Sequence, residues 1–186
     1  MDLSIFLTSN HDSPQPGYTH SRQVELNGLL EKGVFELTTA DEVPYGAQIF
    51  NSWFVDEIKH AGTSKAIEKS RLVVQAYKDA DKKGVLTQAP TIQCASQRLI
   101  LSLAASTHGL EVYMRNISQT YTQSETNLAR DFFVRPLKEL NLPDGLFLKI
   151  LRPLYGIPEA GTHRFRTYHN HHISRLGMKQ SSYDPC

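Results

Sequence analysis

Residues 49–55 read Ile-Phe-Asn-Ser-Trp-Phe-Val, and residues 71–77 read Arg-Leu-Val-Val-Gln-Ala-Tyr. Both runs are rich in the β-branched and aromatic residues that favour strands, and the polar segment 60–64 lies between them. Another apolar run, Val34–Leu37, comes before them, across the turn Val43-Pro44-Tyr45-Gly46. The pattern predicts three strands in the first half of the chain.

Helices are predicted on either side of these strands. Ser21–Lys32 has leucines at helical spacing and is followed by Gly33 as a stop signal. Ser96–His108 begins with Ser96 as its capping residue and ends before Gly109. A last helix is predicted for Glu159–Leu176. The apolar faces of the first two helices are formed by Leu26, Leu29 and Leu30, and by Leu99, Ile100, Leu103 and Ala104.

Further strands are predicted for Glu111–Arg115, Phe132–Arg135 and Phe147–Leu151. Because strands and helices follow one another without regular alternation, the sequence predicts an α+β fold. The length of 186 residues is that of one domain with a substantial core. A hydrophobic content of 40% and a charged content of 21% are typical of a folded protein rather than a disordered one.

The charges are distributed unevenly along the chain. Residues 1–58 contain nine acidic and two basic side chains, a balance of −7. Residues 59–186 contain ten acidic and eighteen basic side chains, a balance of +8, so that the net charge is only +1. A basic body is compatible with a polyanionic partner, and an ordinary solvated surface is the alternative.

The sequence indicates a protein of the cytoplasm or nucleus. No apolar run approaches the roughly 20 residues that span a bilayer. The segment Met1–Leu7 is too short for a signal peptide and lacks a basic start. Cys94 and Cys186 provide neither a disulfide framework nor a metal-ligand spacing, so a reducing compartment is expected. Cys94 lies among apolar residues and is predicted to be a small core side chain.

Two cations lie on one predicted strand, in Lys69-Ser70-Arg71-Leu72-Val73. Side chains alternate along a strand with a period of two, so Lys69 and Arg71 are expected on the same face. Arg binds phosphate through paired hydrogen bonds and Lys as a point charge, so the pair could grip a triphosphate. Basic pairs on exposed strands are also common without any such role.

Five blocks in a fixed order give this pair a context. They are Phe50–Lys59 with a Gly-Thr turn and Lys69–Val73, then Gln88–Thr91 with Gln97-Arg98, Asn116–Tyr121, Pro153–Gly161 and Ser182–Cys186. Together they resemble the reverse transcriptase of Copia-type retrotransposons. The resemblance implies a partial polymerase domain over residues 21–186, preceded by a loose lead-in over residues 1–20. Its fingers would span about 21–109 and the start of its palm about 110–186, with the C-terminal part of the palm missing.

The resemblance also implies a nucleotide-binding site. Lys69 and Arg71 would contact the phosphates of the incoming nucleotide. Tyr121 would lie under the sugar and exclude a 2′-hydroxyl, or it would be a core aromatic side chain at the end of a strand. Tyr155 and Gly156 would shape the template and nucleotide pocket, or they would only form a turn.

The sequence departs from the family pattern at the metal site. Asn116 occupies the position of the first metal-binding aspartate, and an amide oxygen brings no charge to a two-metal site. The family's other two aspartates lie in a Tyr-x-Asp-Asp hairpin downstream of the position of Cys186. Neither Glu111 nor Asp131 is placed to substitute for them. We therefore expect no catalysis and no bound metal in this chain, although the intact family uses Mg²⁺.

The predicted function is that of an inactive fragment of an RNA-directed DNA polymerase from a retrotransposon polyprotein. The alternative is a non-catalytic module that still binds an RNA or DNA template-primer through basic segments 59–83 and 149–179. Self-association is expected if Glu111–Arg115 forms an open sheet edge. A zinc site is disfavoured, because the histidines near the C-terminus lack the spacing of a complete ligand set and fit a solvated or half-buried helix face. They are His163, His169, His171 and His172.

Overall fold

The computed structural model describes residues 17–87 and 89–184. Most of the predicted lead-in over residues 1–20 and the last two residues of the Asp-Pro-Cys block lie outside this range. The helices are α2 (Thr19–Glu31), α3 (Cys94–Ser106) and α4 (Ala160–Ser174). The strands are β1 (Phe35–Thr39), β2 (Ile49–Phe50), β3 (Ser52–Lys59), β4 (Ile67–Val74), β5 (Phe132–Val134) and β6 (Leu146–Ile150). Short 3₁₀ turns are η1 (Ala40–Glu42), η2 (Ala76–Lys78), η3 (Ala80–Gly84) and η4 (Lys138–Leu140).

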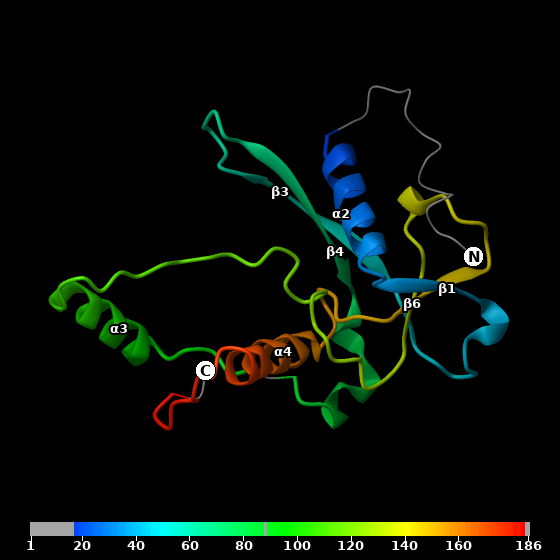
Figure 1. The fold of residues 1–186 in the computed structure, drawn as a ribbon. Helices are drawn as coiled ribbons and strands as arrows, with labels where there is room; N and C mark the ends of the chain where they lie inside the picture. The colour runs from blue at the N-terminus through cyan, green and yellow to red at the C-terminus, as the bar shows by residue number, and fades with distance from the viewer. Residues whose placement is uncertain (1–16, 88, 185–186) are drawn as a thin grey trace.

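The strands form two separate sheets. One has four strands in the order β1-β6-β5-β2, with β1 and β5 antiparallel to β6 and β2 parallel to β5. The other is the antiparallel hairpin of β3 and β4, which projects from the body beside α2 (Figure 1). The mixture of helices with largely antiparallel strands confirms the predicted α+β class.

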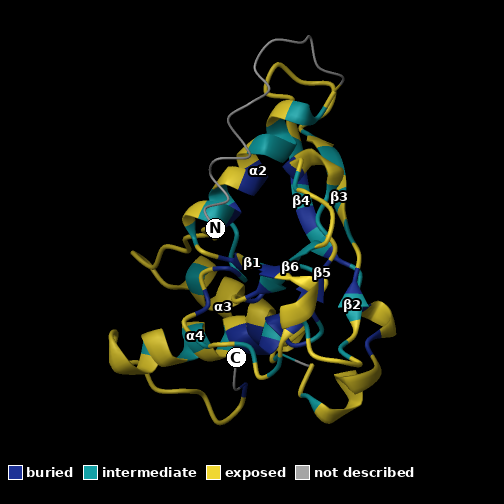
Figure 2. Cartoon of the chain, turned by 90° about the vertical axis from the view of Figure 1, so that its right-hand side faces the viewer, coloured by how far each residue is buried: buried dark blue, intermediate teal, exposed yellow. Residues whose placement is uncertain are grey.

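The core lies where α2, β4 and the four-stranded sheet meet (Figure 2). Leu26 and Leu29 of α2 are fully buried, as the leucine spacing predicted. Leu72 and Val74 of β4 and Leu148 of β6 are buried in the same core cluster. Burial of these side chains is the main source of stability, at about 2 kcal/mol for each of them.

The predicted strand at 49–55 is divided between the two sheets. Phe50 accepts a hydrogen bond from the Arg135 backbone N–H at 2.9 Å, and Asn51 accepts one from the Gln75 N–H at 2.8 Å. Consecutive carbonyls therefore pair with different segments, and the chain passes from β2 to β3 at Asn51. The predicted strand 71–77 is also displaced, because β4 begins at Ile67 and gives way to 3₁₀ structure from Ala76.

The predicted strand Glu111–Arg115 is wrong. The segment has no regular secondary structure and is exposed, and within the described ranges no strand pairs with it. A strand exists only where a second strand supplies hydrogen-bond partners, and an apolar sequence alone does not create one. The open sheet edge expected there is therefore not observed among the described residues.

Helix α3 forms close to its predicted place but differs in detail. Gln93, rather than Ser96, is the N-cap residue. Cys94, expected in the core, is exposed, and so is most of the predicted apolar stripe, including Leu99 and Leu103. Figure 1 shows α3 set apart from the rest of the fold, at the end of an extended segment, and among the described helices and strands none packs extensively on this face.

No helix in the described part of the chain is long and apolar enough to cross a membrane.

The hairpin is joined to the body by a close approach of two backbones. The Val74 N–H donates to the Tyr155 carbonyl at 2.8 Å, and Gly156 next to it has a φ of 88°. A Cβ atom at Gly156 would lie 1.9 Å from the Val74 carbonyl oxygen. Only glycine fits there, because it combines a left-handed backbone with the absence of a side chain.

We predict that Gly156→Ala lowers the free energy of unfolding by about 3 kcal/mol or more, from backbone strain and overlap together. Gly46→Ala is the matched control, since Gly46 also has a positive φ of 78° but has open space around it. Its loss should be limited to about 1–2 kcal/mol of backbone strain. Urea unfolding of both variants measures the difference, and equal losses would contradict the close approach.

Candidate functional site

The two faces of the β3–β4 hairpin have different surroundings. On one face, Asp56 forms an ion pair with Arg22 of α2 at 2.6 Å. On the same face, the hydroxyl oxygens of Ser70 and Ser21 are 2.6 Å apart. The Arg22 guanidinium also holds the pKa of the Asp56 carboxyl below its ordinary value. Helix α2 therefore covers this face, and alternation places Lys69 and Arg71 on the other.

Arg71 meets residues from two distant segments. Its guanidinium forms an ion pair with Glu57 at 2.9 Å, and it lies close enough to the Tyr155 hydroxyl to influence its ionisation. Burial raises the pKa of Tyr155 above its ordinary value, and Arg71 opposes that rise. The hydroxyl is therefore neutral at physiological pH and can both donate and accept a hydrogen bond.

Tyr155 also packs against Tyr121. Their ring centroids are 4.9 Å apart at an interplanar angle of 87°, an edge-to-face arrangement of the favourable kind. Both rings are partly buried and lie against the hydrophobic core. The fold thus brings together Arg71, Tyr121 and Tyr155, three of the five predicted nucleotide-binding residues, and Gly156 follows directly.

The fifth residue, Lys69, is not joined to this group by any contact among the described residues. It borders a neighbouring cleft of about 890 Å³, whose lining also includes residues of α2 and of the segment before Tyr121. Glu25 and Gln119 hold these parts together. The Glu25 carboxylate accepts hydrogen bonds from the Gln119 amide at 3.0 Å and from the Leu72 N–H at 3.4 Å. Neither residue was predicted from the sequence, although a charged residue directly before the buried Leu26 was a signal for Glu25.

Asn116 lies outside this group of residues. It is exposed, on the segment without regular structure that leads from α3 to Tyr121. Glu111 is engaged with the Tyr113 hydroxyl, and Asp131 forms an ion pair with Lys149 at 3.3 Å. Among the described residues, no three His, Cys, Asp or Glu side chains are grouped so that they could hold a metal ion.

A buried ion cluster joins the turn after β4 to the start of α4. Arg130 pairs with both Asp79 and Glu159, whose side chains are 2% and 3% exposed. His163 of α4 lies 2.7 Å from the Thr126 hydroxyl and 3.8 Å from Glu159. Burial of Asp79 raises its pKa, but the hydrogen bonds and charge of Arg130 outweigh that effect and leave the pKa below its ordinary value. No motif in the sequence predicts this cluster.

The histidines near the C-terminus do not share one environment. His163 is buried, which corrects the expectation of a solvated or half-buried face for that residue. His169 stacks on Phe165 at 5.4 Å, and His172 lies 4.0 Å from the Tyr168 ring. These two histidines thus contact aromatic rings on the same helix.

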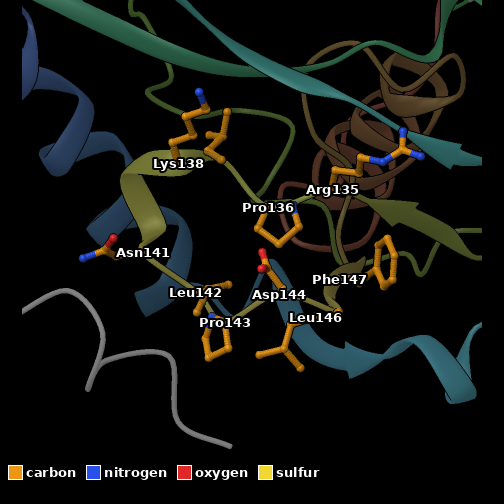
Figure 3. A pocket seen from close by; sticks show the side chains of 11 residues that line it. Arg135, Pro136, Lys138, Asn141, Leu142, Pro143, Asp144, Leu146 and Phe147 are labelled. Atoms are coloured by element: carbon orange, nitrogen blue, oxygen red, sulfur yellow. The ribbon is translucent and has the colours of Figure 1, made fainter.

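Another hollow, of about 590 Å³, is lined by the β5–β6 connection and the start of β6, within residues 135–147 (Figure 3). Arg135 and Lys138 stand at its edge with Asp144 between them. Its lining comes from a single connection and includes none of the predicted site residues, so we do not regard it as the functional site.

Comparison of the chain with protein-family models, with curated proteins and with solved structures gives no match. The candidate site is therefore judged on its own geometry.

We predict a pH dependence that originates at His163. Burial lowers its pKa below the ordinary value near 6.5, so the unfolded chain binds a proton more readily than the folded chain. The stability from this group is present above about pH 6.5 and is lost as the pH falls through the lower pKa of the folded state. His163→Gln should flatten the pH dependence of the unfolding free energy in this window. His108→Gln, at an exposed position, should leave the slope unchanged in urea titrations at each pH.

Proposed function

We propose that this chain is a nucleic-acid-binding domain related to the fingers and early palm of Copia-type reverse transcriptases, without polymerase chemistry of its own. The observation that carries the proposal is the convergence of Arg71, Tyr121 and Tyr155 beside the β3–β4 hairpin. These residues come from three separate sequence blocks of that family pattern, and chance blocks would have no reason to meet.

The chemistry of the group suits a nucleotide. Arg71 offers a planar donor fork for phosphate, and Lys69 adds a point charge on the same face of β4. Glu57 pairs with Arg71, so a phosphate would replace one anionic partner by another. The neutral Tyr155 hydroxyl and the Tyr121 ring provide a polar and a flat surface for the sugar.

A wider basic surface supports an extended partner rather than a free nucleotide. Arg164 of α4 donates to the Thr120 hydroxyl at 2.7 Å, next to Tyr121. Arg152 donates to the Ser124 carbonyl at 3.4 Å. Both belong to the basic segment 149–179, so positive charge continues from the hairpin along the 118–124 loop toward α4.

The proposed lack of turnover rests on Asn116. Two-metal phosphoryl transfer requires carboxylate charge next to both ions, and a neutral amide does not supply it. A binding surface has no such requirement, so binding can persist where catalysis is lost.

We predict that binding of a single-stranded oligonucleotide weakens steeply with salt and that Lys69→Ala reduces the slope. Each phosphate contact contributes about 0.7 to the fall of log K with log salt concentration on single strands. The variant should lose one such increment. Lys138→Ala, at an exposed position in η4 outside both basic segments, is the control and should keep the full slope. Fluorescence anisotropy over a salt series measures both, and salt-insensitive binding would contradict the proposal.

We further predict that the chain does not extend a primer on an RNA template in the presence of Mg²⁺. The reason is the missing carboxylate at Asn116, since catalytic residues act as a set. Extension products are resolved on a gel, with and without EDTA. Extension that EDTA abolishes would overturn the proposed lack of chemistry and leave nucleic-acid binding in place.

A further inference from the structure

A separate cleft of about 560 Å³ lies at the base of the hairpin, where β3 and β4 meet η2 and the Gly156 turn. Trp53 and Tyr77 line it, and they are 54% and 66% exposed. Exposed aromatic residues scattered singly need no explanation. Here two of them share one hollow whose remaining surface includes the apolar side chains of Val73 and Pro158.

The frame of this cleft is held by backbone hydrogen bonds. The N–H groups of Val74 and Gln75 donate to the carbonyls of Tyr155 and Asn51, both at 2.8 Å. Trp53 lies directly opposite Val73 in the β3–β4 register, so its ring stands on a paired strand. The Trp53 ring is therefore carried by paired backbone, and Tyr77 follows in the short 3₁₀ turn η2 just after β4.

The rim of the cleft is positively charged. The Lys82 ammonium donates to the Tyr77 carbonyl at 2.8 Å, which leaves two of its three N–H groups for another acceptor. The Lys78 ammonium lies 5.8 Å from the centre of the Tyr77 ring. The negative charge of Asp79 is paired with Arg130. In this turn, Asp81 is then the acidic residue whose charge can still offset the charges of the lysines.

We propose that the cleft binds an unpaired base of a single-stranded nucleic acid, stacked on Trp53 and Tyr77, with the adjoining phosphate at Lys82. Flat apolar surface next to ammonium groups matches a base joined to a phosphate, and every base has a face that can stack. This inference rests on the proposed function for the class of partner and adds the place where the strand is held.

The cleft and the Arg71 group lie on one continuous surface. Trp53 pairs with Val73, and Val55 pairs with Arg71, on the same face of the hairpin. Two residues along a strand span roughly 7 Å. A single nucleic-acid strand can therefore contact Arg71 with one phosphate and place a nearby base in the cleft.

Trp53 is the one tryptophan of the chain and reports on the cleft directly. Its fluorescence is followed while an oligothymidylate is added, and binding is followed independently by the anisotropy of a labelled strand. The control ligand is an abasic strand of the same length and charge. We expect the oligothymidylate to quench Trp53 with the same affinity that anisotropy gives, and the abasic strand to leave the fluorescence unchanged.

The variant Tyr77→Ala should weaken oligothymidylate binding about tenfold, the effect of losing one stacking surface. Tyr45→Ala removes another exposed tyrosine, outside the cleft, and should leave the affinity unchanged. Tyr77 is largely exposed, so its truncation should not disturb folding, and circular dichroism of the variant checks this.

Three outcomes would overturn the inference while the proposed function stands. They are binding by anisotropy without quenching of Trp53, equal quenching by the abasic strand, and unchanged affinity of Tyr77→Ala. Equal quenching by a blunt duplex would also overturn it, because the base would then not need to be unpaired. Failure of every strand to bind at low salt would instead overturn the proposed function, and this inference with it.

Discussion

The approach of Gly156 to Val74 is the contact on which the rest of the arrangement depends. The β3–β4 hairpin belongs to a different sheet from β1, β6, β5 and β2. It is joined to the body by α2 on one face and by the Val74–Tyr155 hydrogen bond at its base. The absence of a Cβ at Gly156 lets the backbones meet, which places Tyr155 beside Arg71 and closes one wall of the Trp53 cleft.

The Arg130 cluster supports the turn that forms another wall of the Trp53 cleft. Two buried carboxylates and one guanidinium carry an excess of negative charge, and such a group is tolerated only when its hydrogen bonds are satisfied. Asp79 receives two from Arg130 and one from the Asp81 N–H, and Glu159 receives one from Arg130. By holding Asp79, the cluster holds the turn that carries Tyr77 and Lys82. A structural ion cluster and a candidate binding cleft therefore share one loop.

Sequence reasoning succeeded where structure is local and failed where it is not. The leucine spacing of α2 and the turn between β3 and β4 were sufficient to predict those elements. The strand expected at 111–115 failed because pairing depends on a partner that a short window cannot reveal. Of the candidate site, the resemblance supplied Arg71, Tyr121 and Tyr155. The Glu25–Gln119 contact joins residues 94 positions apart, and the Asp79–Arg130 contact joins residues 51 positions apart. No local sequence pattern predicts contacts over such distances along the chain.

Binding and turnover make different demands on the same fold. Turnover needs charged oxygens within a few ångströms of both reacting groups, and a neutral Asn116 on an exposed segment is poorly suited to that task. Binding needs only cations and flat surfaces at roughly the spacing of a strand, and these are carried by paired strands and buried contacts. The parts of the molecule that would bind nucleic acid are thus also parts that hold the fold together. Folding alone requires Gly156, Tyr155 and the Arg130 cluster, so a binding surface of this kind does not depend on any catalytic chemistry.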